Sequence, residues 1–258
     1  SSTQFPCYLE CEINMLFRRR IVIQAQNAHE VRAALEDDFH HFRVSIRHNS
    51  EILTDINGWA VRFPYDACPS AANQLRGLLG MPLSDIAHSV NRQTDAKLQC
   101  THLLDLAGLA IAAAAANIEQ RHYEIAVPQR LLGATSPSLW RNGELYLAWK
   151  TQGTQITAPR PYAGIDLNHG MASWAIRTLS TEEAEAALIL RRCTTISRGR
   201  EYDLDANEHA AETGLCYAQQ PIRAKHARRM VGSTLDFGSQ QELLCATDQA
   251  WLNGDNAS

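Results

Sequence analysis

The sequence lacks several patterns that identify well-known classes of protein. None of its seven cysteines forms a CxxC pair, so the signatures of a zinc ribbon and of a thioredoxin-like site are absent. It contains no glycine-rich phosphate loop and no dinucleotide fingerprint. Its net charge is only −4, without the strongly basic character of a typical nucleic-acid-binding protein. We therefore expect a protein that uses no cofactor and binds no nucleic acid.

Long hydrophobic runs are also scarce. The one long run of small apolar residues, from Leu106 to Ile118, is too short to cross a membrane, and no secretory signal is visible. An odd number of widely spaced cysteines in a long chain argues against a disulfide framework. These features predict a cytoplasmic protein that has no membrane partner.

The rest of the composition is that of a folded globule. The chain has 258 residues, of which 45% are hydrophobic and 20% are charged, and this length is ample for a sizeable core. We expect a single domain over residues 1–258, in which a motif-bearing first half, 15–127, packs against a second half, 128–258. The sequence leaves a homo-oligomer open.

Strand-like patterns dominate the first half. Residues 18–24 are rich in Ile and Val, and residues 30–36 allow a short strand or a helical turn. Residues 39–47 and 52–63 predict a hairpin, with Gly58 as a candidate bulge. Together with the helix signals, they predict an α+β fold that has a largely antiparallel sheet with helices packed on one face.

Helix signals follow these strands. Pro69 after Cys68 marks a helix start, Pro82 opens another short helix, and Thr101 caps a long leucine-rich helix.

The second half mixes both patterns. Residues 144–158 predict a hairpin around Gly153, and residues 167–193 predict two helices, with Ser180 and Glu183 as the capping box of the second. The tail, residues 236–252, predicts a final helix.

Two adjacent histidines are the first candidate for a functional site. Alternation along residues 39–47 places His40 on the apolar face of its strand and His41 on the other face, beside Arg43. One of the two is therefore expected in the site, and the other supports it. The alternative is that His40 is a core histidine that has found a hydrogen-bond partner.

A second candidate lies at the start of the long helix. His102 and Asp105 are three residues apart, which places them on one helical face. A helix N-terminus disfavours a charged imidazole, so His102 is expected to stay neutral and to act as a base oriented by Asp105. The alternative is that Asp105 only complements the helix dipole. We expect His40 or His41 to lie within reach of His102.

Two cysteines at predicted helix starts allow other chemistry. A helix start lowers the pKa of a thiol, so Cys68 or Cys100 is a candidate nucleophile, although buried, inert cysteines are common. Cys68, Cys100, His102 and one of the paired histidines are an alternative set of metal ligands drawn from three segments.

Three further residues are candidates for binding a substrate. Arg62 lies in an otherwise apolar segment and is expected to pair with Asp37, with Asp38 or with an anionic substrate oxygen. Tyr65 and Trp59 are expected to line a pocket for an aromatic molecule.

Long segments of the sequence resemble a known family. The strings EDDFHHFRVSIRH, RFPYDACPSAANQLRGLLGMPL and CTHLLDLAGLAIAAAAA resemble the bacterial domain of unknown function 2889. Later strings, among them PRPYAGIDL and CYAQQP, are similar to its longer members, so the resemblance extends from Phe17 to Pro221. The order of strands and helices in the first half also resembles the iron–sulfur scaffold fold of the NifU/SufE type, in architecture alone.

The resemblance implies a class of function. Family members are associated with bacteria that degrade aromatic compounds, and with formaldehyde-releasing lyases that act on lignin-derived dimers. The resulting hypothesis is a cofactor-independent carbon–carbon lyase acting on a small aromatic, lignin-derived phenolic substrate. A histidine would remove a hydroxyl proton, and an Arg or Tyr would stabilise the developing phenolate. The alternatives are a metal- or cluster-binding scaffold and a thiol-dependent hydrolase.

Overall fold

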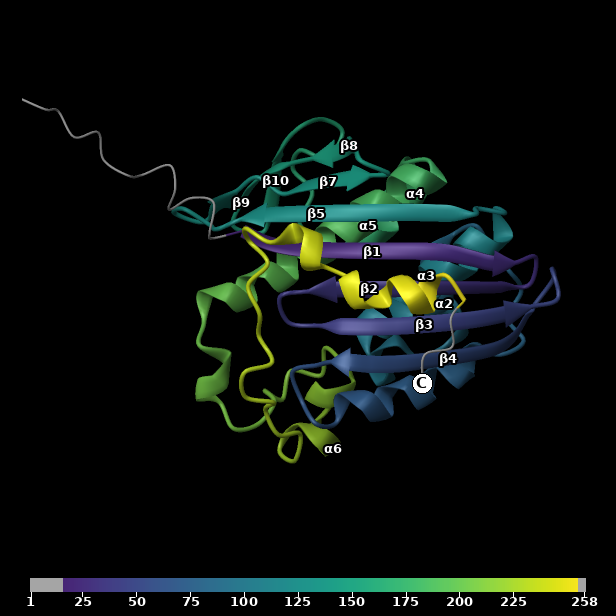
Figure 1. The fold of residues 1–258 in the computed structure, drawn as a ribbon. Coiled ribbons are helices and arrows are strands. Elements are labelled where there is room, and N and C mark those ends of the chain that lie inside the picture. Colours follow the sequence, from purple (N-terminus) through teal and green to yellow (C-terminus); the bar gives the residue numbers. More distant parts are fainter. Residues whose placement is uncertain (1–15, 255–258) are drawn as a thin grey trace, which may run out of the picture.

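A seven-stranded antiparallel sheet is the centre of the molecule. The computed structural model of the protein describes residues 16–254, and its main sheet has the strand order β4-β3-β2-β1-β5-β7-β8 (Figure 1). These strands are β1 (Leu16–Asn27), β2 (Glu30–Asp37), β3 (His41–His48), β4 (Leu53–Arg62), β5 (Gln120–Pro128), β7 (Ser138–Arg141) and β8 (Glu144–Ala148). A small second sheet has the order β10-β9-β6 and comprises β6 (Ala134–Thr135), β9 (Lys150–Gln152) and β10 (Gln155–Ala158). The predicted α+β class and antiparallel sheet are confirmed.

The longer helices lie behind this sheet in the view of Figure 1. They are α3 (Thr101–Ala115), α4 (Met171–Thr178), α5 (Thr181–Ile196) and the 3₁₀ helix η1 (Cys68–Leu78). The short helices η2 (Ala87–Ser89) and α2 (Val90–Gln93) lie between η1 and α3 in the chain. The remaining short helices are η3 (Ala96–Leu98), η4 (Ser197–Glu201), η5 (Leu204–Ala206), η6 (Tyr217–Gln219), α6 (Pro221–Ala224), η7 (Gln241–Leu243), η8 (Ala246–Asp248) and α7 (Gln249–Leu252).

Helix α3 is the central helix of the core. Most of its residues are leucine, alanine or isoleucine, and most are buried against β1, β2 and β3. Its single glycine allows close packing, because a Cβ on Gly108 would lie 2.2 Å from the carbonyl oxygen of Ala87. The predicted cap at Thr101 is wrong: Cys100 occupies the N-cap position, and no side chain caps the helix.

Strand β5 joins the two halves of the chain. It pairs with β1 from Leu16↔Pro128 to Gln24↔Gln120, and β7 and β8 extend the sheet beyond it. The sequence analysis assigned no element to residues 120–127, where one strand follows directly on the long helix. Both halves therefore contribute strands to a single sheet.

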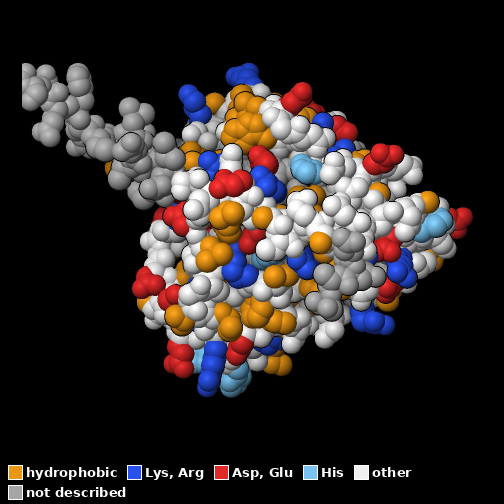
Figure 2. All heavy atoms as spheres, in the orientation of Figure 1, with side chains coloured by type: hydrophobic (Ala, Val, Ile, Leu, Met, Phe, Trp, Pro, Cys, Tyr) orange, Lys and Arg blue, Asp and Glu red, His pale blue; other side chains and the backbone are white. Residues whose placement is uncertain are grey.

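The C-terminal segment covers part of the opposite face of the sheet. In Figure 1, residues 241–252 (yellow) lie in front of β1 and β2. Cys245 and Leu252 pack there against Val22 and Ala34. The predicted long helix over residues 236–252 is wrong, since Cys245 has a positive φ of 58° and an α-helix does not continue through that conformation. On the face shown in Figure 2, acidic and basic side chains are interspersed.

Several local predictions need correction. Gly58 is not a bulge, since it pairs with Val44; its missing side chain instead makes room for Leu75, whose Cδ1 would lie 2.9 Å from an added Cβ. Pro82 opens no helix but forms an isolated bridge with Ile52.

The predicted hairpin of residues 144–158 is half right. Strands β9 and β10 pair around Gly153, whereas β8 pairs with β7. The capping box of Ser180 and Glu183 at α5 is confirmed.

Candidate functional site

The start of β3 sends two adjacent histidines to opposite faces of the sheet, as the alternation predicted. His40 lies on the face covered by α3, where its ring stacks on His102. His41 lies on the other face, where its Nε2 contacts Asp248 at 2.9 Å. The two imidazoles therefore belong to two different clusters.

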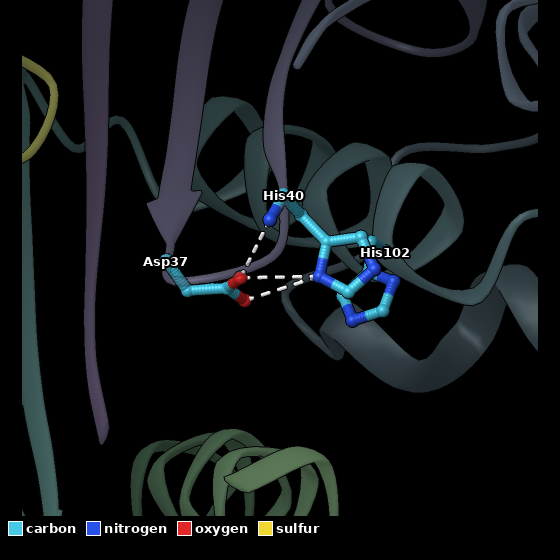
Figure 3. Close-up of side chains that lie close together, drawn as sticks. All are labelled: Asp37, His40 and His102. Atoms are coloured by element: carbon cyan, nitrogen blue, oxygen red, sulfur yellow. Dashed lines mark hydrogen bonds and ion pairs between the residues drawn. The ribbon is translucent and has the colours of Figure 1, made fainter. Parts of the chain in front are cut away.

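Asp37 fixes the turn that precedes His40. One carboxylate oxygen of Asp37 accepts the backbone N–H groups of Phe39 and His40 at 2.7 Å, and lies 3.1 Å from Nδ1 of His40 (Figure 3). The other oxygen accepts the Nε–H of Arg19 at 2.9 Å. Burial alone would raise the pKa of Asp37, but Arg19 and His40 hold it well below its usual range.

His102 completes this cluster from the first turn of α3. Its ring stacks on that of His40 with centroids 3.9 Å apart and an interplanar angle of 28°, so the expected proximity is confirmed. Burial, aided by His40 and Arg19, lowers the pKa of His102 well below 6.5. The imidazole is thus neutral near pH 7, mainly because of burial rather than the helix terminus. Its buried Nε2 has no hydrogen-bond partner among residues 16–254.

Asp105 does not orient His102. Its carboxylate turns towards α5 and accepts the Nε–H of Arg192 at 2.8 Å. The spacing of three residues predicted the helical face of Asp105 but not its partner, because Arg192 of α5 lies next to its carboxylate. Asp37 is the carboxylate of the cluster, and it orients His40 rather than His102.

The second cluster attaches the C-terminal segment to the sheet. Asp248 has a side chain that is 0% exposed, and it accepts hydrogen bonds from His41 and from Nε of Arg43. Glu36 lies 3.5 Å from Nδ1 of His41 and accepts the backbone N–H of Cys245 at 2.7 Å. Both nitrogens of His41 are therefore engaged by carboxylates.

Of the three predicted substrate-binding residues, Arg62 lies beside the histidines, with its guanidinium 3.4 Å from the backbone carbonyl of His40. Arg62 pairs with Glu36, not with the carboxylates of Asp37 or Asp38, although it donates to the backbone carbonyls of both. Its role is to close the end of the β2–β3 hairpin.

The two aromatic candidates lie elsewhere. Tyr65 packs against a separate small cluster around Cys68 and Ala227. Trp59 is 43% exposed and meets Trp251 edge to face on the opposite side of the sheet from His102.

The two candidate cysteines are buried thiols. Burial raises the pKa of Cys100 to about 12 and raises that of Cys68 further, so the expected lowering at a helix start is wrong. Both are therefore protonated at neutral pH.

The alternative metal site built on these cysteines is not assembled. Among residues 16–254, three-residue groups with ligand atoms within 4.8 Å are formed by Asp37, His40 and His102, and by Glu36, His41 and Asp248. Neither group includes a cysteine.

Arg19 is shared by the histidine cluster and a cavity. The cavity, about 100 Å³ in volume, lies between α3 and α5 and is lined by Arg19 but not by His40 or His102. Neither Arg19 nor His88 in its lining was predicted from the sequence, and the basic stretch that includes Arg191 was expected to be a solvated helix end. Only Asp37 carried a local signal for its own role, because an aspartate before a turn commonly accepts the N–H groups that follow it.

The fold and the cluster define an α+β protein with a buried Asp–His–His group. Residues 10–116 match the profile of a family described as "Protein of unknown function (DUF2889)". The resemblance is thus confirmed over this segment, about two fifths of the chain. The segment includes Asp37, His40 and His102, whereas Asp248 lies outside it. No curated protein and no solved structure matches the chain significantly.

Proposed function

We propose that the protein is a cofactor-independent carbon–carbon lyase in which His40 is the general base. The observation that carries the proposal is the Asp37–His40–His102 cluster, in which an ionised carboxylate holds one nitrogen of His40 beside a neutral second imidazole. This revises the assignment made from the sequence, which gave the role of base to His102. The aromatic, lignin-derived substrate class rests on the family resemblance.

The hydrogen bond that His40 donates to Asp37 determines which nitrogen of His40 is free to react. Because the carboxylate accepts the Nδ1–H, the neutral ring carries its lone pair on Nε2. The side chain of His40 keeps 11% of its surface exposed, so the ring is not wholly sealed from solvent. An imidazole oriented in this way is suited to removing a proton.

The proposed reaction releases formaldehyde from a hydroxymethyl group. His40 takes the hydroxyl proton, the oxygen forms a carbonyl double bond, and the adjacent carbon–carbon bond breaks. The substrate reacts as its quinone methide, which forms from the phenol by loss of water from the benzylic carbon. The two electrons of the broken bond form a new carbon–carbon double bond, and the pair displaced through the conjugated system moves to the quinone-methide oxygen, which becomes a phenolate. His102 is neutral and has an N–H to donate to the oxygen that gains charge.

Formaldehyde release from lignin-derived compounds that carry a hydroxymethyl group tests the proposal. His40→Ala should lower turnover by about two to four powers of ten, the usual worth of a general base, and change substrate binding much less. His41→Gln is the matched control, since it alters the neighbouring residue on the other face. Cys100→Ser should retain activity. Full activity of His40→Ala together with an inactive Cys100→Ser would make the protein a thiol enzyme.

Metal binding is the second candidate function. The ligand atoms of Asp37, His40 and His102 lie within 4.8 Å of one another, and two histidines with one carboxylate are a familiar ligand set. Arg19 argues against it, because a guanidinium already neutralises Asp37. Stoichiometric metal in purified protein, lost in His40→Ala and His102→Ala, would favour this function over the lyase.

We also propose that the protein works in the reducing cytoplasm. The five cysteines of the described residues are free thiols. In residues 16–254, no helix is long and apolar enough to cross a membrane.

A further inference from the structure

The cavity next to Arg19 has an enclosed apolar part. Ile21 and Leu35 of the sheet form its floor, and Leu109 of α3 and Ile189 of α5 form its walls; all four side chains are buried. Apolar cavities of about 150 Å³ take up benzene. At about 100 Å³, this cavity accommodates a short alkyl chain or part of a single ring, and a two-ring molecule does not fit inside it.

Two adjacent arginines line the same cavity near the end of α5. Arg192 has a counter-ion, because it pairs with Asp105. Arg191 donates its Nε–H to the carbonyl of Leu167, and no carboxylate of residues 16–254 lies within ion-pair distance of it.

The unpaired cation is also partly buried. Burial, together with the neighbouring Arg192, lowers the pKa of Arg191, although Asp105 and Asp166 oppose the shift. An arginine taken partly out of water normally has an anionic partner.

His88 adds a neutral donor to the lining. Asn91 donates an amide N–H to the backbone carbonyl of His88 at 3.2 Å, and the same nitrogen lies 3.0 Å from Nδ1 of His88. Nδ1 is therefore the acceptor, and Nε2 carries the hydrogen. Burial lowers the pKa of His88, and Arg191 and Arg192 lower it further although Asp105 opposes them, so the ring is neutral near pH 7.

We infer that this cavity is a binding site for a small monocarboxylate, whose apolar body enters between α3 and α5 and whose carboxylate pairs with Arg191. A planar guanidinium matches a carboxylate with two parallel hydrogen bonds, and His88 is a third donor in the same lining. The site is separate from the histidine cluster, since Arg19 is the side chain common to both and is held by Asp37. It stands or falls independently of the proposed lyase activity.

Calorimetric titration of the whole protein tests the inference without any turnover. The probes are benzoate and the straight-chain carboxylates from propionate to octanoate. Wild-type protein should bind at least one of them. Affinity should rise with chain length until the cavity is full, and then level off. Absence of binding by every member at millimolar concentration would overturn the inference.

Two further probes test whether binding needs both the negative charge and the apolar body: benzyl alcohol lacks the charge, and inorganic phosphate lacks the apolar body. Benzyl alcohol should bind about tenfold to a hundredfold more weakly than benzoate, because it has no charge to pair with Arg191. Inorganic phosphate should not compete, because it has no apolar body. Equal affinity for the alcohol and the acid, or competition by phosphate, would contradict the assignment to a monocarboxylate.

Arg191 variants locate the site. Arg191→Gln should weaken benzoate binding by about tenfold to a hundredfold, and Arg191→Lys should lose less, since it restores the charge but not the paired geometry. Arg177→Gln is the matched control: Arg177 is an exposed arginine of α4 outside the cavity lining. If Arg191→Gln binds like wild type, or if Arg177→Gln loses as much, the carboxylate is not at Arg191.

Discussion

The two faces of the sheet hold clusters built from the same types of side chain. On one face, His40 contacts Asp37, and on the other, the next residue, His41, contacts Asp248. Each aspartate is buried and also pairs with an arginine of the sheet. The two clusters differ in how many imidazole nitrogens have a partner. The first cluster includes a second imidazole, His102, whose buried Nε2 has no hydrogen-bond partner among residues 16–254. In the other cluster, carboxylates contact both nitrogens of His41.

This difference is the reason for proposing that the His40 cluster is reactive and the His41 cluster structural. Carboxylates contact both nitrogens of His41, and Glu36 also binds the backbone of Cys245, so we expect the His41 cluster to hold the C-terminal segment in place. A buried polar atom without a partner costs about 1–3 kcal/mol, and such a cost is commonly retained where a group has a function. Residue type therefore says less about function than the number of hydrogen bonds left unmade.

The largest expected effect comes from breaking the structural cluster. Asp248→Asn should lower the free energy of unfolding by about 3–5 kcal/mol, because it leaves the partly buried Arg43 without a counter-ion. Urea unfolding of the purified variant measures the loss.

Asp236→Asn is the control for this prediction. Asp236 also pairs with an arginine, Arg200, but its side chain is 55% exposed, so the variant should lose only about 0–1 kcal/mol. Equal losses for the two variants would show that the buried cluster is not what holds the C-terminal segment.

The reverse sign is expected at His102. His102→Phe keeps a ring stacked on His40 and removes the buried Nε2 that has no partner, so it should raise the free energy of unfolding by about 1–3 kcal/mol. The same change at His41 should be destabilising, because it removes both carboxylate contacts. If His102→Phe and His41→Phe both lowered the free energy of unfolding in urea by the same amount, the two clusters would not differ in the way described.

The lowered pKa of His102 predicts a pH dependence of stability. The unfolded chain takes up the proton near pH 6.5 and the folded chain only well below that value, so protonation favours unfolding. Relative to His102→Phe, the wild type should lose up to about 1.4 kcal/mol per pH unit as the pH falls below about 6.5, and nothing above it. Urea titrations of both proteins across this range give the difference directly, and a constant difference would show that His102 is not buried in its neutral form.

The smallest effect concerns Trp59. Trp59→Ala should lower stability by about 0.5–1.5 kcal/mol, through its edge-to-face contact with Trp251, and leave formaldehyde release unchanged. If the variant lost turnover but kept its stability, Trp59 would belong to the substrate site. That result would contradict the assignment of the active site to the face that carries His40 and His102.

Strong local patterns in the sequence predicted the fold class. The alternation of residues 39–47 placed both histidines correctly, and the capping box located α5 to within a few residues. Strand β5 was missed because its partner, β1, lies about a hundred residues earlier, and no local pattern encodes that pairing. The tail was mistaken for a helix because one positive φ, at Cys245, is invisible in a hydrophobic pattern.

The site was predicted in part for the same reason. Proximity of His40 and His102 followed from a strand and a helix that share the core, whereas their partners were set by tertiary packing. Asp105 found Arg192 on α5, and Arg19 found Asp37 on the neighbouring strand. Counter-ions that come from distant segments cannot be read from spacing along the chain.

The position of α7 has a consequence for biosynthesis. The strands that it covers leave the ribosome about two hundred residues before the segment that covers them. A nascent chain therefore carries Val22 and Ala34 uncovered, with His41 and Arg43 lacking Asp248, throughout translation of the intervening two hundred residues or so. A premature stop codon shortly before Asp248 would release a chain that has its long helices but lacks the segment that covers Val22 and Ala34. Chaperones and proteases recognise such incompletely covered chains.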